Sequence, residues 1–349
     1  MNQQNVVIAE NLERSLNEAI EACEHDKVFI LADETTRNCC LPVVEGFAAL
    51  RGAKRITIGA TDTHKTLESL AHVWEELGAG GGTRHSLLIN IGGGMVTDLG
   101  GFAASTFKRG INYINIPTTL LSMVDASVGG KTGINFRGLK NEIGVFNNAS
   151  TVILDTQFLK TLDAENICSG YAEMLKHGLI SNEAMWAELM NFDLETPDLK
   201  LLSRMVGDSV AVKERIVTED PTEKGIRKAL NLGHTVGHAF ESLALQRTPV
   251  LHGYAVAWGL ICELYLSCIK TGFPTDKMRQ TVRFIQTHYG NMDISCDDYP
   301  TLLELMTHDK KNVAGIINFT LLGGIGDIRI NQTATKEEIC EALDFYREG

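Results

Sequence analysis

Residues 86–105 read SLLINIGGGMVTDLGGFAAS, and this stretch decides the fold of the first half of the chain. Ser86–Ile91 is an apolar run with the length of a buried strand. Three glycines follow, Gly92–Gly94, and the next residues are helix-like. A strand that enters a helix through a glycine turn lets backbone N–H groups approach a phosphate closely. Thr97 stands where a G-x-G-x-x-G fingerprint has its last glycine, so a tight turn without a ligand remains the alternative.

Shorter apolar strands lie on both sides of this stretch, and helical patterns separate them. The candidate strands are residues 27–32, 55–59, 113–116 and 151–155. Strands that alternate with helices predict a parallel sheet covered on both faces. Beyond these strands the pattern is helical almost to the end, although residues 316–322 are strand-like. We therefore expect an α/β domain with a parallel sheet over residues 1–159 and an all-α domain over residues 160–349.

The composition is that of an ordinary globular protein, with 44% hydrophobic and 22% charged residues among 349. The N-terminal residues lack the features of a signal peptide, and the eight cysteines lack framework spacing. We therefore expect a cytoplasmic protein with reduced thiols. The formal net charge of −12 argues against nucleic-acid or membrane partners, because both need a basic surface. An anionic small substrate fits this charge only if cations gather at one site.

A second stretch, residues 227–241, reads RKALNLGHTVGHAFE and concentrates the polar chemistry. On one continuous helix, a single polar stripe would hold Arg227, Asn231, His234, His238 and Glu241. A solvated helix face usually carries Glu and Lys rather than two histidines. Histidines at i,i+4 are a common metal-binding spacing, although the pair alone leaves a solvated face as the alternative.

Four further residues stand out against their helical surroundings. Glu173 and Lys176 share one helix face at i,i+3, and a surface salt bridge is the alternative to a functional role. Lys213 interrupts an apolar stripe, which costs free energy unless its ammonium meets an anion or reaches solvent. His252 begins an apolar helix, where the helix dipole favours a neutral imidazole that can bind a metal.

Seven motifs follow one another along the chain. They are GGGMVTDLGGF (92–102), PTTLLSMVDASVGGKT (117–132), LKNEIG (139–144), GYAEMLKHG (170–178), LNLGHTVGHAFE (230–241), LHGYAVAWG (251–259) and DKK (309–311). Together they resemble the 3-dehydroquinate synthase family, which belongs to the sugar phosphate cyclases. The resemblance extends from about residue 27 to residue 326, and the order of the motifs makes it specific.

The resemblance implies a Rossmann-like first domain that binds NAD and an α-helical second domain that binds metal and substrate. The implied cofactors are therefore NAD and one divalent metal ion, zinc or cobalt. The implied metal ligands are Glu173, His234 and His252, which makes His238 a site residue that is not a ligand. The implied NAD contacts are Asp62, Lys65, Gly94, Met95, Val96, Thr97, Asp98, Thr118, Thr119, Lys131, Lys140, Phe158, Leu159, Lys160 and Thr161. The chain departs from the family pattern at Asp62, where Glu is usual, and at Leu139, where glycine is usual.

The resemblance also implies an anionic sugar phosphate substrate and a homodimer. The implied catalytic and substrate-binding residues are Arg109, Asp125, Lys131, Asn141, Lys176, Lys213, Arg227, Asn231, His238, Lys310 and Lys311. The implied reaction converts 3-deoxy-D-arabino-heptulosonate 7-phosphate into 3-dehydroquinate and phosphate. It would proceed by transient oxidation by NAD, elimination of phosphate, reduction and intramolecular aldol closure.

Three other functions fit part of these motifs. A sister cyclase that acts on sedoheptulose 7-phosphate would share most of them. A glycerol-dehydrogenase-like enzyme would have no use for the cluster of Lys213, Arg227 and Lys310. A catalytically inactive NAD-binding regulator is expected to have lost part of the metal triad, and none is lost here.

Overall fold

The computed structural model describes residues 4–307 and 317–349. The chain divides into two compact units, of which the first comprises Met1–Asp163 and Asp198–Val210. The second comprises Ala164–Pro197 and Ala211–Gly349. No pattern in the sequence indicated that a later segment returns to the first unit. The domain limits of 1–159 and 160–349 stay predictions.

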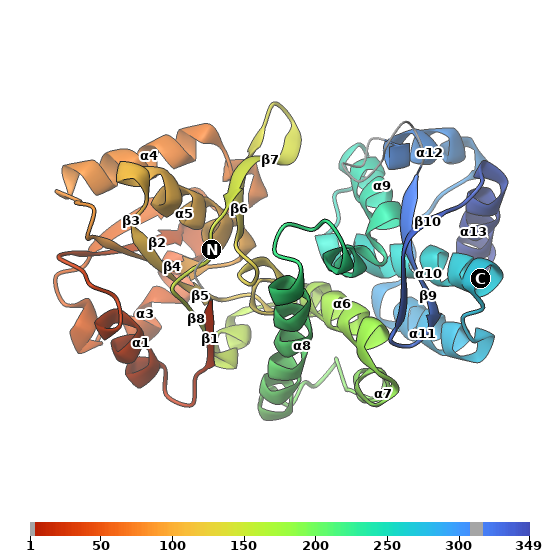
Figure 1. Cartoon of the computed structure of the whole chain (residues 1–349), viewed down its shortest axis with the longest axis horizontal. Coiled ribbons are helices and arrows are strands. Elements are labelled where there is room, and N and C mark those ends of the chain that lie inside the picture. The colour runs from red at the N-terminus through yellow and green to blue at the C-terminus, as the bar shows by residue number, and fades with distance from the viewer. Residues whose placement is uncertain (1–3, 308–316) are drawn as a thin grey trace. The chain divides into compact units, whose positions relative to one another are not determined.

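The first unit is built on a six-stranded sheet in the order β1-β8-β5-β4-β2-β3 (Figure 1). Its strands are β1 (Asn5–Ile8), β2 (Val28–Asp33), β3 (Lys54–Ile58), β4 (Leu87–Gly92), β5 (Asn112–Pro117) and β8 (Thr151–Leu154). All neighbouring strands pair in parallel. Every residue of β4 and β8 is buried, as expected for a parallel sheet with both faces covered. The predicted α/β fold is confirmed.

Helices pack against both faces of this sheet. They include α1 (Leu12–Glu21), α2 (Glu34–Cys39), α3 (Leu41–Val44), α4 (Leu67–Ala79) and α5 (Gly94–Thr106). In Figure 1, α4 and α5 lie on one side of the sheet and α1 and α3 on the other. In α1, Leu12, Leu16 and Ile20 are buried at helical spacing, and Asn11 caps the first turn. These helices therefore form because each has one apolar face to bury.

The direction in which strands are added reverses at β4. From β2 to β3 the sheet grows towards one edge, and from β4 through β5 to β8 it grows towards the other. Ligands of open α/β sheets bind at such a reversal, outside the carboxyl ends of the strands. The predicted NAD segments at residues 62–65, 94–98, 118–119 and 158–161 follow the carboxyl ends of β3, β4, β5 and β8. They therefore share one edge of the sheet.

A hairpin of β6 (Lys131–Phe136) and β7 (Leu139–Phe146) was not predicted from the sequence. Arg137 and Gly138 form its turn with φ values of 49° and 82°. A two-residue turn with positive φ at both positions normally begins with Asn, Asp or Gly. Because arginine stands at the first position here, the sequence did not indicate a turn.

The second unit is mainly helical, as predicted. Its helices are α6 (Ala164–Ser181), α7 (Glu183–Met190), α9 (His234–Leu245), α10 (His252–Thr271), α11 (Thr275–Tyr289), α12 (Tyr299–Thr307) and α13 (Lys336–Glu348), and α8 (Leu199–Glu219) is divided between the two units. The second unit also contains an antiparallel ribbon of β9 (Asn318–Gly324) and β10 (Asp327–Thr333). The prediction of an all-α domain therefore missed this ribbon. Side chains along β10 alternate between exposed and half-buried, as expected for a strand with one covered face.

Residues 227–241 do not form one helix. Ile226–Asn231 forms a 3-10 helix, and two residues separate it from the start of α9. Gly233, between them, has a φ of 80°, in the left-handed region that ends regular helices. The predicted single polar stripe is therefore wrong, because its arginine and asparagine belong to the 3-10 helix and its histidines to α9.

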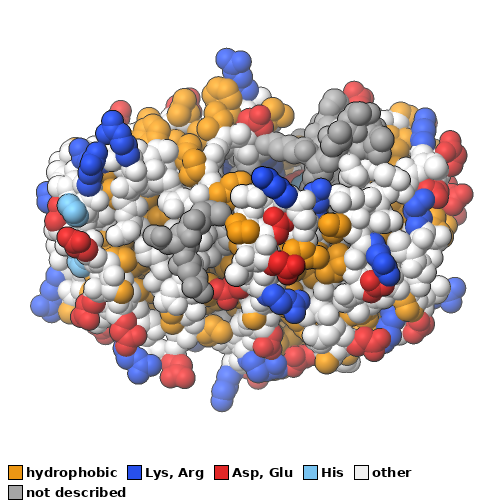
Figure 2. All heavy atoms as spheres, in the orientation of Figure 1, with side chains coloured by type: hydrophobic (Ala, Val, Ile, Leu, Met, Phe, Trp, Pro, Cys, Tyr) orange, Lys and Arg blue, Asp and Glu red, His pale blue; other side chains and the backbone are white. Residues whose placement is uncertain are grey.

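Acidic and basic side chains are scattered over the face of the molecule that Figure 2 shows. On the described part of that face, the blue Lys and Arg side chains form no continuous patch. All eight cysteines are free. The described helices include none with the length and apolar character needed to cross a membrane.

Candidate active site

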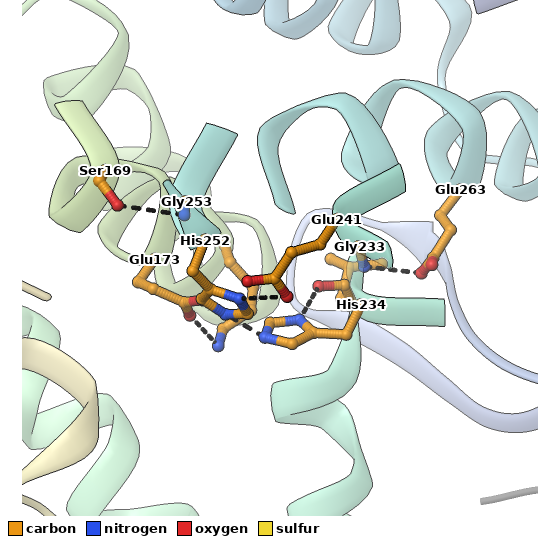
Figure 3. A network of polar contacts seen from close by, with 10 residues as sticks. Ser169, Glu173, Gly233, His234, Glu241, His252, Gly253 and Glu263 are labelled. Carbon is orange, nitrogen blue, oxygen red and sulfur yellow. Dashed lines mark hydrogen bonds and ion pairs between the residues drawn. The ribbon is translucent and has the colours of Figure 1, made fainter. Parts of the chain in front are cut away.

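Three side chains with metal-ligand chemistry converge in the second unit (Figure 3). Glu173 belongs to α6, His234 is the first residue of α9, and His252 is the first residue of α10. Glu173 Oε1 lies 3.3 Å from His234 Nε2 and 3.6 Å from His252 Nε2. Residues from three separate segments thus present one oxygen and two nitrogens to a common point.

The other ring nitrogens fix the orientation of both imidazoles. His234 Nδ1 lies 3.1 Å from Leu232 O, and His252 Nδ1 lies 3.3 Å from Glu241 Oε2. With each Nδ1 held by an oxygen, Nε2 is the ring atom that each histidine directs towards Glu173 and could offer to a metal ion in place of a proton. Partners of this kind orient the ligands of metal sites. Glu241 belonged to the predicted polar stripe, but no role was predicted for it.

Glu173 divides its carboxylate between a lysine and the two imidazoles. Its Oε2 accepts a hydrogen bond from Lys176 Nζ, and both side chains are buried, so the surface salt bridge considered above is wrong. Its buried Oε1 lacks a hydrogen bond of good geometry among the described residues. Burial raises the pKa of Glu173, but Lys176 and His234 outweigh it and hold that pKa well below the ordinary value. The oxygen that faces the imidazoles is therefore anionic and suited to a cation.

The two imidazoles differ in charge. Burial lowers the pKa of His234 to about 4 against the opposing effect of Glu173, so this ring is neutral. Burial acts in the same direction on His252, but hydrogen bonds to Glu173 and Glu241 raise its pKa to about 10. Glu173 and Glu241 thus favour positive charge beside His252. A divalent cation meets the same demand, so one carboxylate and two histidines fit a catalytic metal site.

His238 offers a second set of ligands. Its ring centroid lies 5.3 Å from that of His234 and 5.8 Å from that of His252. One ligand atom from each of these three histidines lies within 4.8 Å of the others. Glu173 fits the third position better than His238, because its Oε1 is a buried anionic oxygen that faces both rings.

Two polar contacts tie the ligand-bearing helices together. Gly253 N, next to the first residue of α10, donates to Ser169 Oγ of α6 at 3.1 Å. A Cβ at Gly253 would lie 1.9 Å from Ser169 O, so only glycine allows this approach. Glu263 of α10 accepts hydrogen bonds from Gly233 N and Val236 N at the start of α9. Ser169 and Glu263 were not predicted from the sequence. Glu263 is a single carboxylate in the middle of an apolar helix, which is itself an indication that its side chain has a buried partner.

Four Lys or Arg side chains are buried among the described residues, and the sequence analysis had named all four. They are Lys65, Lys176, Lys213 and Arg227. The last three belong to the second unit, as does the Glu–His–His cluster. Burying a cation costs free energy unless it meets an anion. Lys176 meets Glu173, and Lys213 and Arg227 are the buried cations of this unit that could contact an anionic ligand.

The loop before the 3-10 helix shapes the surroundings of Arg227. Asp220 accepts hydrogen bonds from three backbone N–H groups of this loop, that of Arg227 included, at 2.6–3.1 Å. Arg227 Nη1 donates to Pro221 O at 2.7 Å. Asn231 Nδ2 donates to Glu223 Oε1 at 2.8 Å. The sequence analysis missed Asp220 and Glu223, because such contacts depend on the path of an irregular loop.

The glycine turn after β4 in the first unit fits a phosphate group. Gly93 precedes α5, and no side chain caps this helix start. A Cβ at Gly93 would lie 3.2 Å from the Thr119 side chain, and one at Gly94 would lie 3.2 Å from the Ala126 side chain. Backbone N–H groups at a bare helix start are the donors that a dinucleotide phosphate uses. The predicted NAD residues of this turn therefore fit that cofactor.

A hydrogen-bond network joins several predicted site residues of the first unit. Lys65 Nζ donates to Asp98 Oδ2 and to Asn141 Oδ1, each at 2.5 Å. Asn135 accepts from Asn141 N at 2.9 Å and donates to Asp62 Oδ2 at 3.0 Å. Lys65 thus balances the charge of Asp98, which would otherwise repel a phosphate at the neighbouring turn. The sequence analysis missed Asn135 because it missed the hairpin.

Two family models together match most of the chain. The model described as 3-dehydroquinate synthase N-terminal matches residues 55–169, and the one described as 3-dehydroquinate synthase C-terminal matches residues 170–312. The chain belongs to the 3-dehydroquinate synthase family. A 3-dehydroquinate synthase of Parabacteroides distasonis is 56% identical over 100% of this chain and 99% of the relative. The resemblance inferred from the seven motifs is confirmed.

Solved structures of other cyclases share this fold. The 2-epi-5-epi-valiolone synthase of Streptomyces hygroscopicus, with NAD+ and Zn2+ bound, has a TM-score of 0.85 at 26% identity, with 100% of this chain and 98% of the other covered. A 2-deoxy-scyllo-inosose synthase complexed with carbaglucose-6-phosphate, NAD+ and Co2+ has a TM-score of 0.84 at 23% identity, with 99% and 96% covered. The second likeness shows the fold alone.

The remaining described residues expected from the 3-dehydroquinate synthase family all belong to the first unit, and five of these twelve are exposed. Those that are exposed are Arg109, Lys131, Lys140, Lys160 and Thr161. Those that are buried or half-buried are Met95, Val96, Thr97, Thr118, Asp125, Phe158 and Leu159. Lys310 and Lys311 lie outside the described residues.

Proposed function

We propose that this chain converts 3-deoxy-D-arabino-heptulosonate 7-phosphate into 3-dehydroquinate and phosphate, with NAD and one divalent metal ion, zinc or cobalt. The observation that carries the proposal is the approach of Glu173 Oε1 to two imidazole Nε2 atoms, in a unit that also buries three cations. Membership of the 3-dehydroquinate synthase family supports the same reaction.

Glu173, His234 and His252 would hold the metal ion, and His238 would contact the substrate instead. When bound, the metal ion would polarise substrate oxygen as a Lewis acid, and NAD would supply reversible hydride transfer. The chain itself supplies binding, orientation and charge. Lys176 keeps Glu173 ionised through their buried ion pair. The NAD contacts would be the predicted segments at the carboxyl ends of β3, β4, β5 and β8, with Lys131 and Lys140 of the hairpin.

Buried cations of the second unit would bind the anionic groups of the substrate. Lys213 and Arg227 suit the carboxylate or the phosphate, because charge-assisted hydrogen bonds from buried donors are strong. Asn231, half-buried beside Glu223, suits a hydroxyl group. The remaining residues assigned to the substrate are Arg109, Asp125, Lys131, Asn141, Lys310 and Lys311.

An assay of phosphate release tests the reaction. The purified protein with NAD and zinc or cobalt should release phosphate from the heptulosonate 7-phosphate and form 3-dehydroquinate. Sedoheptulose 7-phosphate in its place distinguishes the sister cyclases. A higher kcat/KM for sedoheptulose 7-phosphate would contradict the proposal.

We also infer that the enzyme acts in the cytoplasm as a homodimer. The family resemblance supports both inferences, and eight free cysteines are compatible with a reducing compartment. Sedimentation equilibrium of the purified protein tests the assembly, and a monomer at micromolar concentration would contradict it.

A further inference from the structure

Glu263 is a fully buried carboxylate in the middle of α10. Its Oε2 accepts a hydrogen bond from Gly233 N at 2.6 Å (Figure 3). Its Oε1 accepts one from Val236 N at 3.1 Å. Both oxygens act as acceptors, which is the role of an ionised carboxylate. A buried carboxylate is costly, so its contacts with the start of another helix call for an explanation.

Helix α9 has no cap of its own. The first N–H groups of a helix lack partners within the helix, and a side chain of the preceding residue usually supplies one. Here the preceding residue is Gly233, which has no side chain. Glu263 supplies the acceptor from α10 instead, and its negative charge lies at the positive end of the α9 dipole.

The two N–H groups that Glu263 binds lie on either side of His234. Gly233 precedes this histidine, and Val236 follows two residues later. Glu263 also lies on the helix that begins with His252, about three turns further along. One carboxylate therefore links the segment that orients His234 to the helix that carries His252.

We propose that Glu263 is a positioning residue that sets the backbone of His234 and thereby the affinity of the metal site. The inference rests on the proposed metal site and adds a residue that contacts neither metal nor substrate. Ser169 joins α6 to α10, and Glu241, near the other end of α9, binds His252 at the start of α10. Glu263 is the contact that fixes where α9 begins relative to α10.

Glu263→Gln tests this role, because the variant keeps the size of the side chain and replaces one acceptor oxygen with an NH₂ donor. That donor would face an N–H group. The measurements are zinc affinity by competition with a chelator, and the visible absorption of the Co2+-loaded protein, both without substrate or NAD. Loss of a residue that orients metal ligands lowers metal affinity roughly 10- to 100-fold. We expect a loss of this size and a changed cobalt spectrum.

Ser267→Ala is the matched control. Ser267 lies one turn further along α10, is buried, and binds Leu322 N and Glu263 O, so its loss destabilises the same helix without touching α9. If Ser267→Ala loses as much thermal stability as Glu263→Gln, it should still have the zinc affinity and the cobalt spectrum of the wild type. Equal losses of affinity in both variants would reduce Glu263 to a general stabilising residue. A wild-type protein that binds no metal would instead overturn the proposed site itself.

Hydrogen exchange in the unsubstituted protein gives a second test that needs no folded variant. In the metal-free protein, the amides of Gly233 and Val236 should already be as protected as those in the middle of α9. Protection that develops only after zinc is added would mean that the metal ion sets the start of the helix, and the proposal would be overturned.

Discussion

At the scale of single residues, the site depends on how Glu173 shares its two oxygens. One oxygen pairs with Lys176, and the other faces two imidazoles whose remaining nitrogens are held by Leu232 O and Glu241. This arrangement fixes the positions of three potential ligand atoms before any ion arrives. A preformed site binds a metal ion without first ordering its ligands.

The two sets of candidate ligands lead to opposite results for two histidine variants. His252→Ala should lose bound metal and turnover, because both Glu173 and Glu241 would then face a gap. His238→Ala should keep the metal and lose turnover, because His238 is assigned to the substrate. Metal content per chain, measured by elemental analysis after dialysis, decides between them. Retention of metal by His252→Ala together with its loss in His238→Ala would show that the ligand assignment is wrong.

Arg227 should matter for the substrate and not for the metal or NAD. Loss of a buried, charge-assisted contact costs about 2–4 kcal/mol, or roughly 30- to 1000-fold in kcat/KM. We expect Arg227→Ala to lose this much with unchanged metal content. Lys228→Ala is the control, because it removes the next cation along the chain, which binds Asn331 at the surface. Activity of Arg227→Ala within threefold of wild type would contradict the role.

Lys213 gives a parallel test on another element. It is buried in α8, whereas Lys200 of the same helix is exposed. Lys213→Ala should lower kcat/KM by a similar factor, and Lys200→Ala should leave it unchanged. If both variants turned over the heptulosonate like the wild type, the buried Lys213 would have no role in substrate binding.

At the scale of elements, Gly233 determines how the central stretch is divided. Its φ of 80° suits glycine, and a Cβ would lie 2.8 Å from the Leu260 side chain and 3.1 Å from Val256 O. Gly233→Ala should therefore cost backbone strain of roughly 1 kcal/mol and overpacking of roughly 1–3 kcal/mol. Gly272→Ala is the control, with a φ of 79° and open space around the new methyl group. Urea unfolding should show a larger loss of stability for Gly233→Ala, and equal losses would contradict the packing argument.

The same stretch shows what the sequence could and could not predict. The strand, glycine turn and helix at residues 86–105 were predicted correctly because each has a strong local pattern. The division at Gly233 was not predicted, since glycine also occurs inside helices and the left-handed φ follows from packing against α10. The motifs contain the residue types that bind metal ions, so candidate metal ligands could be named from the sequence. Residues that orient those ligands, such as Ser169 and Glu263, depend on contacts between distant segments and carry no local signal strong enough to assign them.

At the scale of the whole molecule, the chain keeps the two chemical requirements of the reaction in different units. The glycine turn suited to NAD belongs to the first unit, and the Glu–His–His cluster with its buried cations belongs to the second. A formal net charge of −12 is compatible with an anionic substrate because the four buried cations are all predicted site residues. Each cofactor should therefore be removable without unfolding the unit that holds the other.

The proposed reaction makes a specific demand on the two cofactors. NAD should be required and not consumed, because the hydride taken from the substrate returns to it before the ring closes. With NAD below the substrate concentration, phosphate released should exceed the NAD supplied, and absorbance at the NADH wavelength should not rise in proportion. Chelation should stop phosphate release, and added zinc or cobalt should restore it. One NADH accumulated for each substrate consumed would identify a dehydrogenase, and turnover that persists after complete removal of metal would exclude the role given to Glu173, His234 and His252.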